Sequence, residues 1–158
     1  MLTDLYLIDS AGRTVLVAKL QSLLHKNYTI EDSLGATSGY IEEKTHLTHR
    51  TFALQDAGHS VVSAINVSNV EVNRAPPKSW IEDGAGNRLA NVVFMMGFAS
   101  FAVVKEDGST ILQASLSFGG GFRETVERLS SRAYSIQLSD QSFTPPMVLA
   151  TVAALDRA

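Results

Sequence analysis

Residues 145–158 read PPMVLATVAALDRA, and this stretch decides the fold that the sequence predicts. Two prolines suit the first turn of a helix, where their missing amide hydrogens would have no partner within the helix. Thr144 or Ser142 offers a hydroxyl to cap that helix. Residues 147–155 are apolar except for one threonine. Because a helix that is apolar on every side is buried on every side, we predict a helix near residues 145–156 inside the protein.

The remainder of the chain repeats the pattern of a β-hairpin about every 24 residues. In each unit, a run of alternating apolar and polar residues leads to an aspartate and a glycine, and a second such run follows. The aspartate side chain accepts hydrogen bonds from turn amides, and glycine adopts the positive φ of a tight turn. The predicted turn pairs are Asp9 with Gly12, Asp32 with Gly35, Asp56 with Gly58, Asp83 with Gly84, and Asp107 with Gly108.

A sixth, less regular unit covers residues 116–140, so the chain would supply roughly twelve antiparallel strands. Strands in one small domain must close or stack to hide their edges. A barrel of about twelve strands is too wide for its own side chains to fill. The apolar helix, roughly 14 Å long, would fill it. We therefore predict one all-β domain over residues 1–158, a closed antiparallel barrel of roughly twelve strands around a buried C-terminal helix.

Composition excludes several classes of function. The chain has 158 residues, 45% of them apolar, and a formal net charge of −3, which argues against a nucleic-acid partner. It contains no cysteine, so disulfides, thiolate zinc sites and cysteine nucleophiles are excluded. Asp4 and Asp9 lie where a signal peptide needs basic and apolar residues. No apolar run reaches the 20 or so residues of a membrane span. We expect a cytoplasmic protein.

Two segments carry a resemblance to a known family. Residues 20–65 contain hairpins of the form aromatic-x-Ile-x-Asp-x-x-Gly, and residues 76–90, PPKSWIEDGAGNRLA, add a related one. With the terminal helix, this order resembles the tubby C-terminal-like superfamily, in particular LURP-one-related proteins and phospholipid scramblases. The resemblance implies a twelve-stranded barrel around a central helix. It also implies binding of phosphoinositides or association with membranes, because members of the superfamily do so.

The best candidate for an anion site follows three consecutive glycines at 119–121. Arg123, Arg128 and Arg132 would gather loosely on one side of a helical segment and hold a lipid phosphate or another anion. The alternative is a solvated, salt-bridged surface segment, because two glutamates lie between the arginines. Weaker candidates for the same role pair Lys44 with Arg50 and Arg74 with Lys78.

Other polar residues have simpler interpretations. His46 and His49 would point to opposite faces of a strand, so they would share a metal only if the chain turns there. The repeated aspartates are turn formers rather than a catalytic set. Residues 92–104, VVFMMGFASFAVV, are either an exposed lipid or protein patch or two core strands, and we favour the core. No metal, cofactor or catalytic residue is predicted.

These observations favour a non-catalytic binding module that engages anionic lipid headgroups, a membrane surface or a partner protein. The alternative is an intracellular carrier of a small apolar ligand inside the barrel. An enzyme is disfavoured, because no residue can be given a catalytic role. We expect the protein in the cytoplasm, peripheral at membranes if it binds lipid.

Overall fold

The computed structural model describes residues 4–22, 24–68, 78–95, 100–116 and 134–156. They form eleven strands and, after the last strand, one helix, α2 (Pro145–Leu155). The strands, in chain order, are β1 (Leu5–Ile8), β2 (Thr14–Leu20), β3 (Tyr28–Asp32), β4 (Thr37–Thr45), β5 (His49–Asp56), β6 (Val61–Ser68), β7 (Ser79–Asp83), β8 (Arg88–Met95), β9 (Ser100–Val104), β10 (Thr110–Leu116) and β11 (Tyr134–Leu138).

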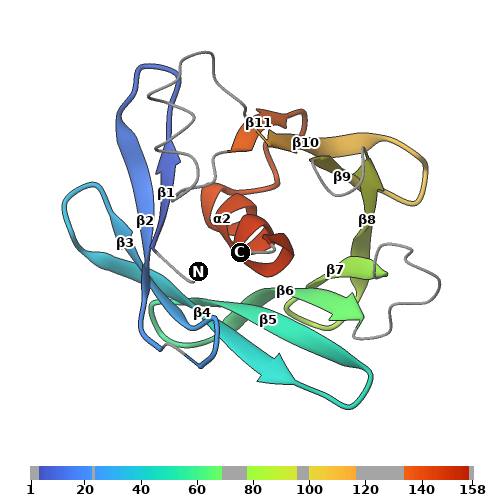
Figure 1. The fold of residues 1–158 in the computed structure, drawn as a ribbon, viewed down its shortest axis with the longest axis horizontal. Helices are drawn as coiled ribbons and strands as arrows, with labels where there is room; N and C mark the ends of the chain where they lie inside the picture. The colour runs from blue at the N-terminus through green and yellow to red at the C-terminus, as the bar shows by residue number, and fades with distance from the viewer. Residues whose placement is uncertain (1–3, 23, 69–77, 96–99, 117–133, 157–158) are drawn as a thin grey trace.

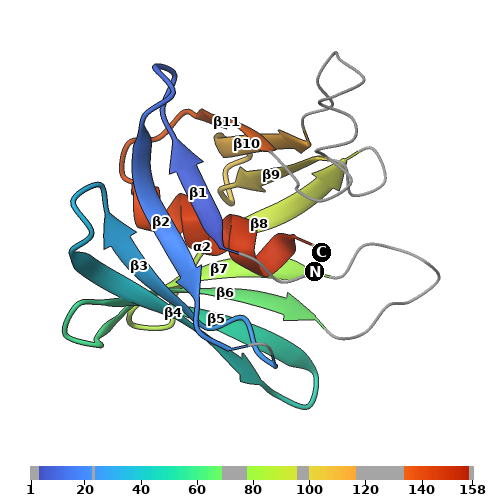
Figure 2. The ribbon, with the colours of Figure 1, turned by 60° about the vertical axis from the view of Figure 1, so that its left-hand side comes forward.

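The strands form a single antiparallel sheet in which each strand pairs with its neighbours in the chain. This sheet curves around α2, which lies at the centre of the ring of strands in Figure 1. The side view in Figure 2 shows the helix running along the concave side of the sheet. The predicted all-β antiparallel fold with a buried C-terminal helix is therefore confirmed.

The closed twelve-stranded barrel is not observed. Eleven strands are described, β1 and β11 form the two ends of the sheet, and no described pairing joins them. The sixth predicted unit would supply a further strand, but residues 117–133 of that unit lie outside the described residues. The described part of the fold is thus an open, curved sheet around a helix.

Burial of α2 agrees with its composition. Ala150 and Thr151 are fully buried, and Leu149 is 3% exposed. The Thr151 hydroxyl donates to the Met147 carbonyl at 2.7 Å, which satisfies the single polar side chain among residues 147–155. The helix packs against β1, β2, β5 and β6. The fully buried large side chains of the sheet are Ile30, Ile41, Phe52, Leu54, Ile65, Ile81, Phe101, Val103 and Leu112.

The start of α2 differs from the prediction in one respect. Thr144 is the N-cap residue, but its side chain makes no capping hydrogen bond. The Ser142 hydroxyl donates instead to Asp140, at 2.7 Å. Prolines occupy the first two helical positions and have no amide hydrogen. The first turn therefore has two fewer donors that need a capping side chain.

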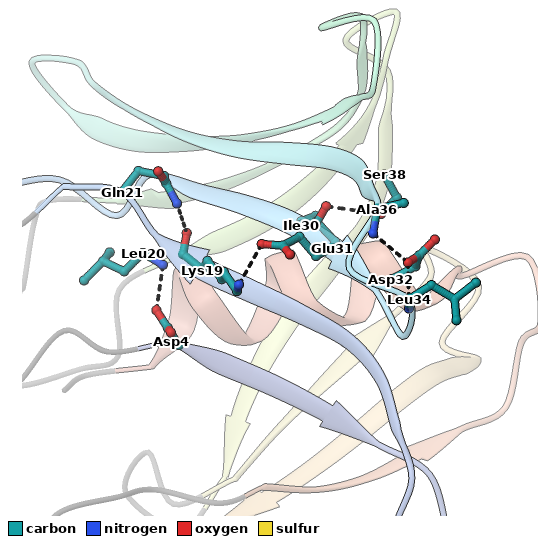
Figure 3. Close-up of polar contacts among 10 residues, drawn as sticks. All are labelled: Asp4, Lys19, Leu20, Gln21, Ile30, Glu31, Asp32, Leu34, Ala36 and Ser38. Atoms are coloured by element: carbon teal, nitrogen blue, oxygen red, sulfur yellow. Dashed lines mark hydrogen bonds and ion pairs between the residues drawn. The ribbon is translucent and has the colours of Figure 1, made fainter.

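Four of the predicted hairpin turns share one geometry. Oδ1 of Asp9 accepts the amide hydrogens of Ala11 and Arg13, both at 2.9 Å. Figure 3 shows the equivalent bonds of Asp32 to the amides of Leu34 and Ala36. Asp56 and Asp83 repeat this pattern. These bonds stabilise the charged carboxylate, and the backbone amide of Asn87 is the main reason that the pKa of Asp83 is lowered.

Two predicted glycine positions are wrong. The residue with positive φ lies three positions after the aspartate, so Gly86 (φ 87°) takes this role rather than Gly84. In the third turn the same position belongs to His59 (φ 64°) rather than Gly58. A type I turn followed by one left-handed residue creates a bulge, and the strand registers shift beside these turns.

In the fifth turn, the predicted aspartate does not occupy the position that aspartate occupies in the other turns. Three residues before Gly108 lies Lys105, and the Lys105 amide donates to the Ser109 carbonyl at 2.9 Å. Asp107 lies within the turn and bonds Ser109 instead. The Lys105 ammonium pairs with Asp140 at 2.7 Å. This hydrogen bond raises the pKa of Lys105 and lowers the pKa of Asp140.

The C-terminal end of α2 is joined to the sheet by Lys26, in the β2–β3 connection. Its Nζ donates to the carbonyl of Ala153 at 2.9 Å and to that of Asp156 at 2.6 Å. Carbonyls at the end of a helix lack partners within the helix and carry partial negative charge. The Tyr134 hydroxyl donates to the Asp156 carboxylate at 3.0 Å. These contacts allow an apolar helix to end inside a sheet.

We predict that Lys26→Met lowers the free energy of unfolding by about 2 kcal/mol, because two carbonyls at the helix end lose a charged donor. Chemical denaturation would measure this. Lys19→Met is the matched control, since Lys19 is half exposed and pairs with Glu31 at 3.1 Å (Figure 3). Such surface pairs contribute at most about 1 kcal/mol. Equal losses in the two variants would contradict the role given to Lys26.

Tyr28, at the start of β3, lies close to the same end of α2. Burial raises its pKa to about 12, and the negative charges of Asp156, Glu43 and Asp4 add to the effect. The neutral phenol is therefore favoured in the folded protein. Because the folded pKa lies above the ordinary value of 10.0, the stability that neutral Tyr28 contributes is full below pH 10.0 and is lost as the pH rises toward 12.

We predict one tyrosine ionisation at a pH of about 12 in the folded protein, absent from Tyr28→Phe. The ultraviolet absorbance of tyrosinate would measure it. Between pH 10.0 and 12 the wild type should lose more stability than the Phe variant. Tyr6→Phe is the control, because Tyr6 is 60% exposed. Superimposable titration curves for wild type and Tyr28→Phe would contradict this assignment.

Candidate functional site

Side chains alternate between the two faces of a strand, and α2 with the core side chains occupies the inner face. A functional surface is therefore best sought on the outer face. Polar and aromatic side chains gather there on four consecutive strands, which we call the outer polar surface. Its residues are Tyr40, Glu42 and Lys44 on β4, His49, Thr51, Ala53 and Gln55 on β5, Ala64 and Asn66 on β6, and Trp80 and Glu82 on β7.

Two alanines occupy the middle of this surface. Ala53 is paired with Glu42 on one side and with Ala64 on the other, and Ala64 is paired with Glu82. The two alanines are only 4% and 8% exposed although they face outward, so larger neighbours shelter them. Three strand spacings of about 4.8 Å separate the two glutamates, roughly 14 Å in all. A floor of methyl groups thus lies between two carboxylates.

Three aromatic rings lie beside this floor, that of Trp80 on β7 and those of His46 and His49. The Trp80 indole N–H donates to Glu82 at 3.0 Å, and the Arg88 guanidinium lies over the indole ring, 5.1 Å from its centroid. The His49 ring lies 5.7 Å from Trp80 between centroids, and His46 stacks on His49 at 4.6 Å. Trp80 is thus held by a carboxylate, a cation and an imidazole.

The histidine pair departs from the expected strand geometry. His46 lies in the connection between β4 and β5, and its amide donates to the His49 carbonyl at 2.8 Å. This turn brings the two rings onto the same side of the chain. Within the described ranges, no group of three or more histidine, aspartate or glutamate residues could hold a metal ion. The two rings stack on one another in this structure.

Asn66 is the most unusual residue of the outer polar surface. It is 3% exposed, and its Oδ1 accepts a hydrogen bond from the Thr51 hydroxyl at 2.8 Å. Its Nδ2 is buried without a hydrogen-bond partner. Strand register places Asn66 directly between Thr51 and Trp80. A buried donor without an acceptor costs about 1–3 kcal/mol.

The opposite end of the surface contains a second polar cluster. Tyr40 stacks on His59 with centroids 4.1 Å apart. Nδ1 of His59 lies 3.2 Å from Oε1 of Gln55, and Nε2 of Gln55 donates to Glu42 at 2.9 Å. Because the amide nitrogen of Gln55 faces Glu42, its oxygen accepts from His59, so Nδ1 carries the hydrogen. These contacts offset the backbone strain of His59, which takes a left-handed conformation that glycine adopts at lower cost.

The predicted anion-site residues are not placed by the structure. Arg123, Arg128, Arg132 and the three glycines at 119–121 lie outside the described residues, as does Arg74. Lys44 is exposed on the outer polar surface, whereas Arg50 pairs with Glu43 at 3.5 Å. The anion site at Arg123, Arg128 and Arg132 therefore stays a prediction.

The apolar stretch at residues 92–104 belongs to the core where it is described. Phe101 and Val103 are 2% and 0% exposed, and Val92 and Phe94 pack against the same core. Val93, which alternates with them, is 48% exposed. Residues 96–99 lie outside the described part. An exposed patch for a lipid or a protein therefore stays a prediction only for these residues and Val93.

Sequence reasoning missed the outer polar surface. One signal was present in the sequence, since the polar residue Asn66 lies between the apolar residues Ile65 and Val67. An outward-facing position of a strand does not require an asparagine. Its significance depends on strand register. The neighbours Thr51 and Trp80 are 15 and 14 residues away, and only the pairing of β5, β6 and β7 brings them together.

Comparison with known proteins gives no further guidance. No protein family, no curated protein and no solved structure matches this chain. Among the described residues, no helix has the length and apolar character needed to cross a lipid bilayer.

We predict that Asn66→Leu raises the free energy of unfolding by about 1 kcal/mol, because a buried unpaired amide is replaced by an apolar group of similar size. The Thr51 hydroxyl, which is only partly buried, can bond water instead. Chemical denaturation would measure this. The control is Asn91→Leu, the same change at the partner of Trp80 on β8, which should bring no gain. A loss of stability in Asn66→Leu would contradict the cost assigned to the unpaired amide.

Proposed function

We propose that this chain is a non-catalytic binding module whose ligand surface is the outer polar surface. The observation that carries the proposal is the position of α2. The helix fills the concave side of the sheet, where Ala150 and Leu112 are each 0% exposed. Recognition of a partner therefore belongs to the outside of the sheet. The outer polar surface offers rings, carboxylates and an amide there, which are the groups typical of specific recognition.

We also propose that the fold is the barrel of the tubby C-terminal-like superfamily, which this chain resembles through LURP-one-related and scramblase-like members. Consecutive antiparallel hairpins around a C-terminal helix support this relationship. Because members of that superfamily bind phosphoinositides or act at membranes, anionic lipid headgroups and membrane surfaces are one class of ligand to test. A partner protein is the other class that this resemblance favours.

The alternative, a carrier of a small apolar ligand, has less support. Such a ligand would need the interior of the barrel, and α2 occupies the concave side of the sheet. An enzymatic function also lacks support within the described residues. The strongest polar clusters there, at Trp80 and at His59, contain no nucleophile placed beside a base.

A binding panel would test the proposal. Full-length protein would be applied to vesicles of phosphatidylcholine, with and without phosphatidylserine or a phosphoinositide, to a peptide array and to a glycan array. We expect binding in one class, lost or at least about ten-fold weaker in Trp80→Ala, because Trp80 is the largest side chain of the surface. Gln113→Ala, on the outer face of β10, is the control that should bind like the wild type. Absence of binding in every class, or equal binding by Trp80→Ala, would refute the proposal.

A further inference from the structure

We infer that the outer polar surface binds a neutral carbohydrate next to Trp80, with Asn66 as a donor to a sugar hydroxyl. This inference rests on the proposed function, since it names the ligand class of the same surface. The hydrogen-bonding capacity, the charge and the ring geometry around Asn66 support it.

The unpaired amide nitrogen of Asn66 requires an acceptor. Thr51 already donates to the amide oxygen, so the Thr51 hydroxyl and the Asn66 amide form a chain that ends in an unused N–H group. An oxygen atom from a ligand would complete this chain and remove the cost of the unpaired donor. Because this gain arises only on binding, it contributes directly to affinity.

The same place also offers acceptors. Glu82 lies beside Trp80 on β7 and uses one oxygen to accept the indole N–H. Glu42, across the alanine floor, accepts from Gln55. A carboxylate has about four lone-pair positions, so each glutamate can accept further bonds. A ligand that both donates and accepts hydrogen bonds fits these residues, and a sugar hydroxyl does both.

Charge narrows the class further. Glu42 and Glu82 flank the floor and would repel a phosphate or another anion next to Asn66, which ranks anionic lipid headgroups below neutral ligands at this surface. Arg88, which lies over the indole ring, and Lys44, which lies two residues after Glu42 on β4, would repel a cation. A ligand without net charge avoids both penalties. The half-buried indole of Trp80 supplies the apolar contact that the C–H face of a sugar ring requires.

Access to Asn66 requires a side chain to move, because its Nδ2 is buried. Trp80 is the directly opposed residue on β7 and is only half buried. We take a rotation of the indole as the movement that opens the site, and loss of its contacts with Glu82 and Arg88 would change the surroundings of the ring. Trp80 is also the single tryptophan of the chain, so its fluorescence reports on this site alone.

Fluorescence titration of the full-length protein would test the inference. The probes are neutral oligosaccharides of glucose, mannose and N-acetylglucosamine. We expect a saturable change in Trp80 emission with at least one of them, and an apparent Kd about ten-fold weaker in Asn66→Leu, which loses the donor. The stability measurement described above, made on the same Asn66→Leu protein, separates weaker binding from unfolding, because we expect this variant to be at least as stable as the wild type. The control Gln113→Leu should bind like the wild type.

The outcomes separate the two proposals. No response to any oligosaccharide, or an equal response of Asn66→Leu and wild type, would overturn the carbohydrate site. If vesicles or peptides bind in a Trp80-dependent way and sugars do not, the carbohydrate inference fails while the proposed function stands. If no class of ligand binds, both fail.

Discussion

Burial of α2 is the constraint on which the rest of the structure depends. A helix with Val148, Leu149 and Ala150 on adjoining positions has no side that water favours, so the sheet must surround it. The long meander does so by curving, and the inward-facing positions of its strands are apolar as a consequence. The last carbonyls of the helix remain polar inside this enclosure, and Lys26 satisfies two of them. One cation in a connecting loop thereby joins the last element to an early hairpin.

The curvature depends on a turn that is used repeatedly. An aspartate bonded to the amides two and four residues later, followed by a left-handed residue, fixes a tight turn and a bulge. The bulge increases the local twist of the strands that follow it. Lys105 and His59 are the exceptions within this scheme. Lys105 replaces an aspartate and pairs with Asp140, and His59 replaces a glycine and connects its turn to the outer polar surface.

Because α2 occupies the interior, we propose recognition on the outer face, and that face is not uniform. Across β4 to β7, small side chains at Ala53 and Ala64 separate polar and aromatic ones. The unpaired amide of Asn66 beside Trp80 is the feature that stability alone does not explain, since an apolar residue there would avoid the cost. Its presence is the physical reason to assign a ligand to this surface.

The sequence by itself determined the elements that arise from local patterns. Alternation of apolar residues predicted the strands, aspartate followed by glycine predicted where the turns lie although two of the glycines were wrong, and the apolar run at 147–155 predicted the buried helix, because these signals act over a few residues. Only the tertiary structure decided which outward side chains are neighbours. Each bulge shifts the register, so Thr51, Asn66 and Trp80 meet through pairings that no local pattern specifies. The core around α2 could therefore be predicted from the sequence, whereas the candidate surface could not.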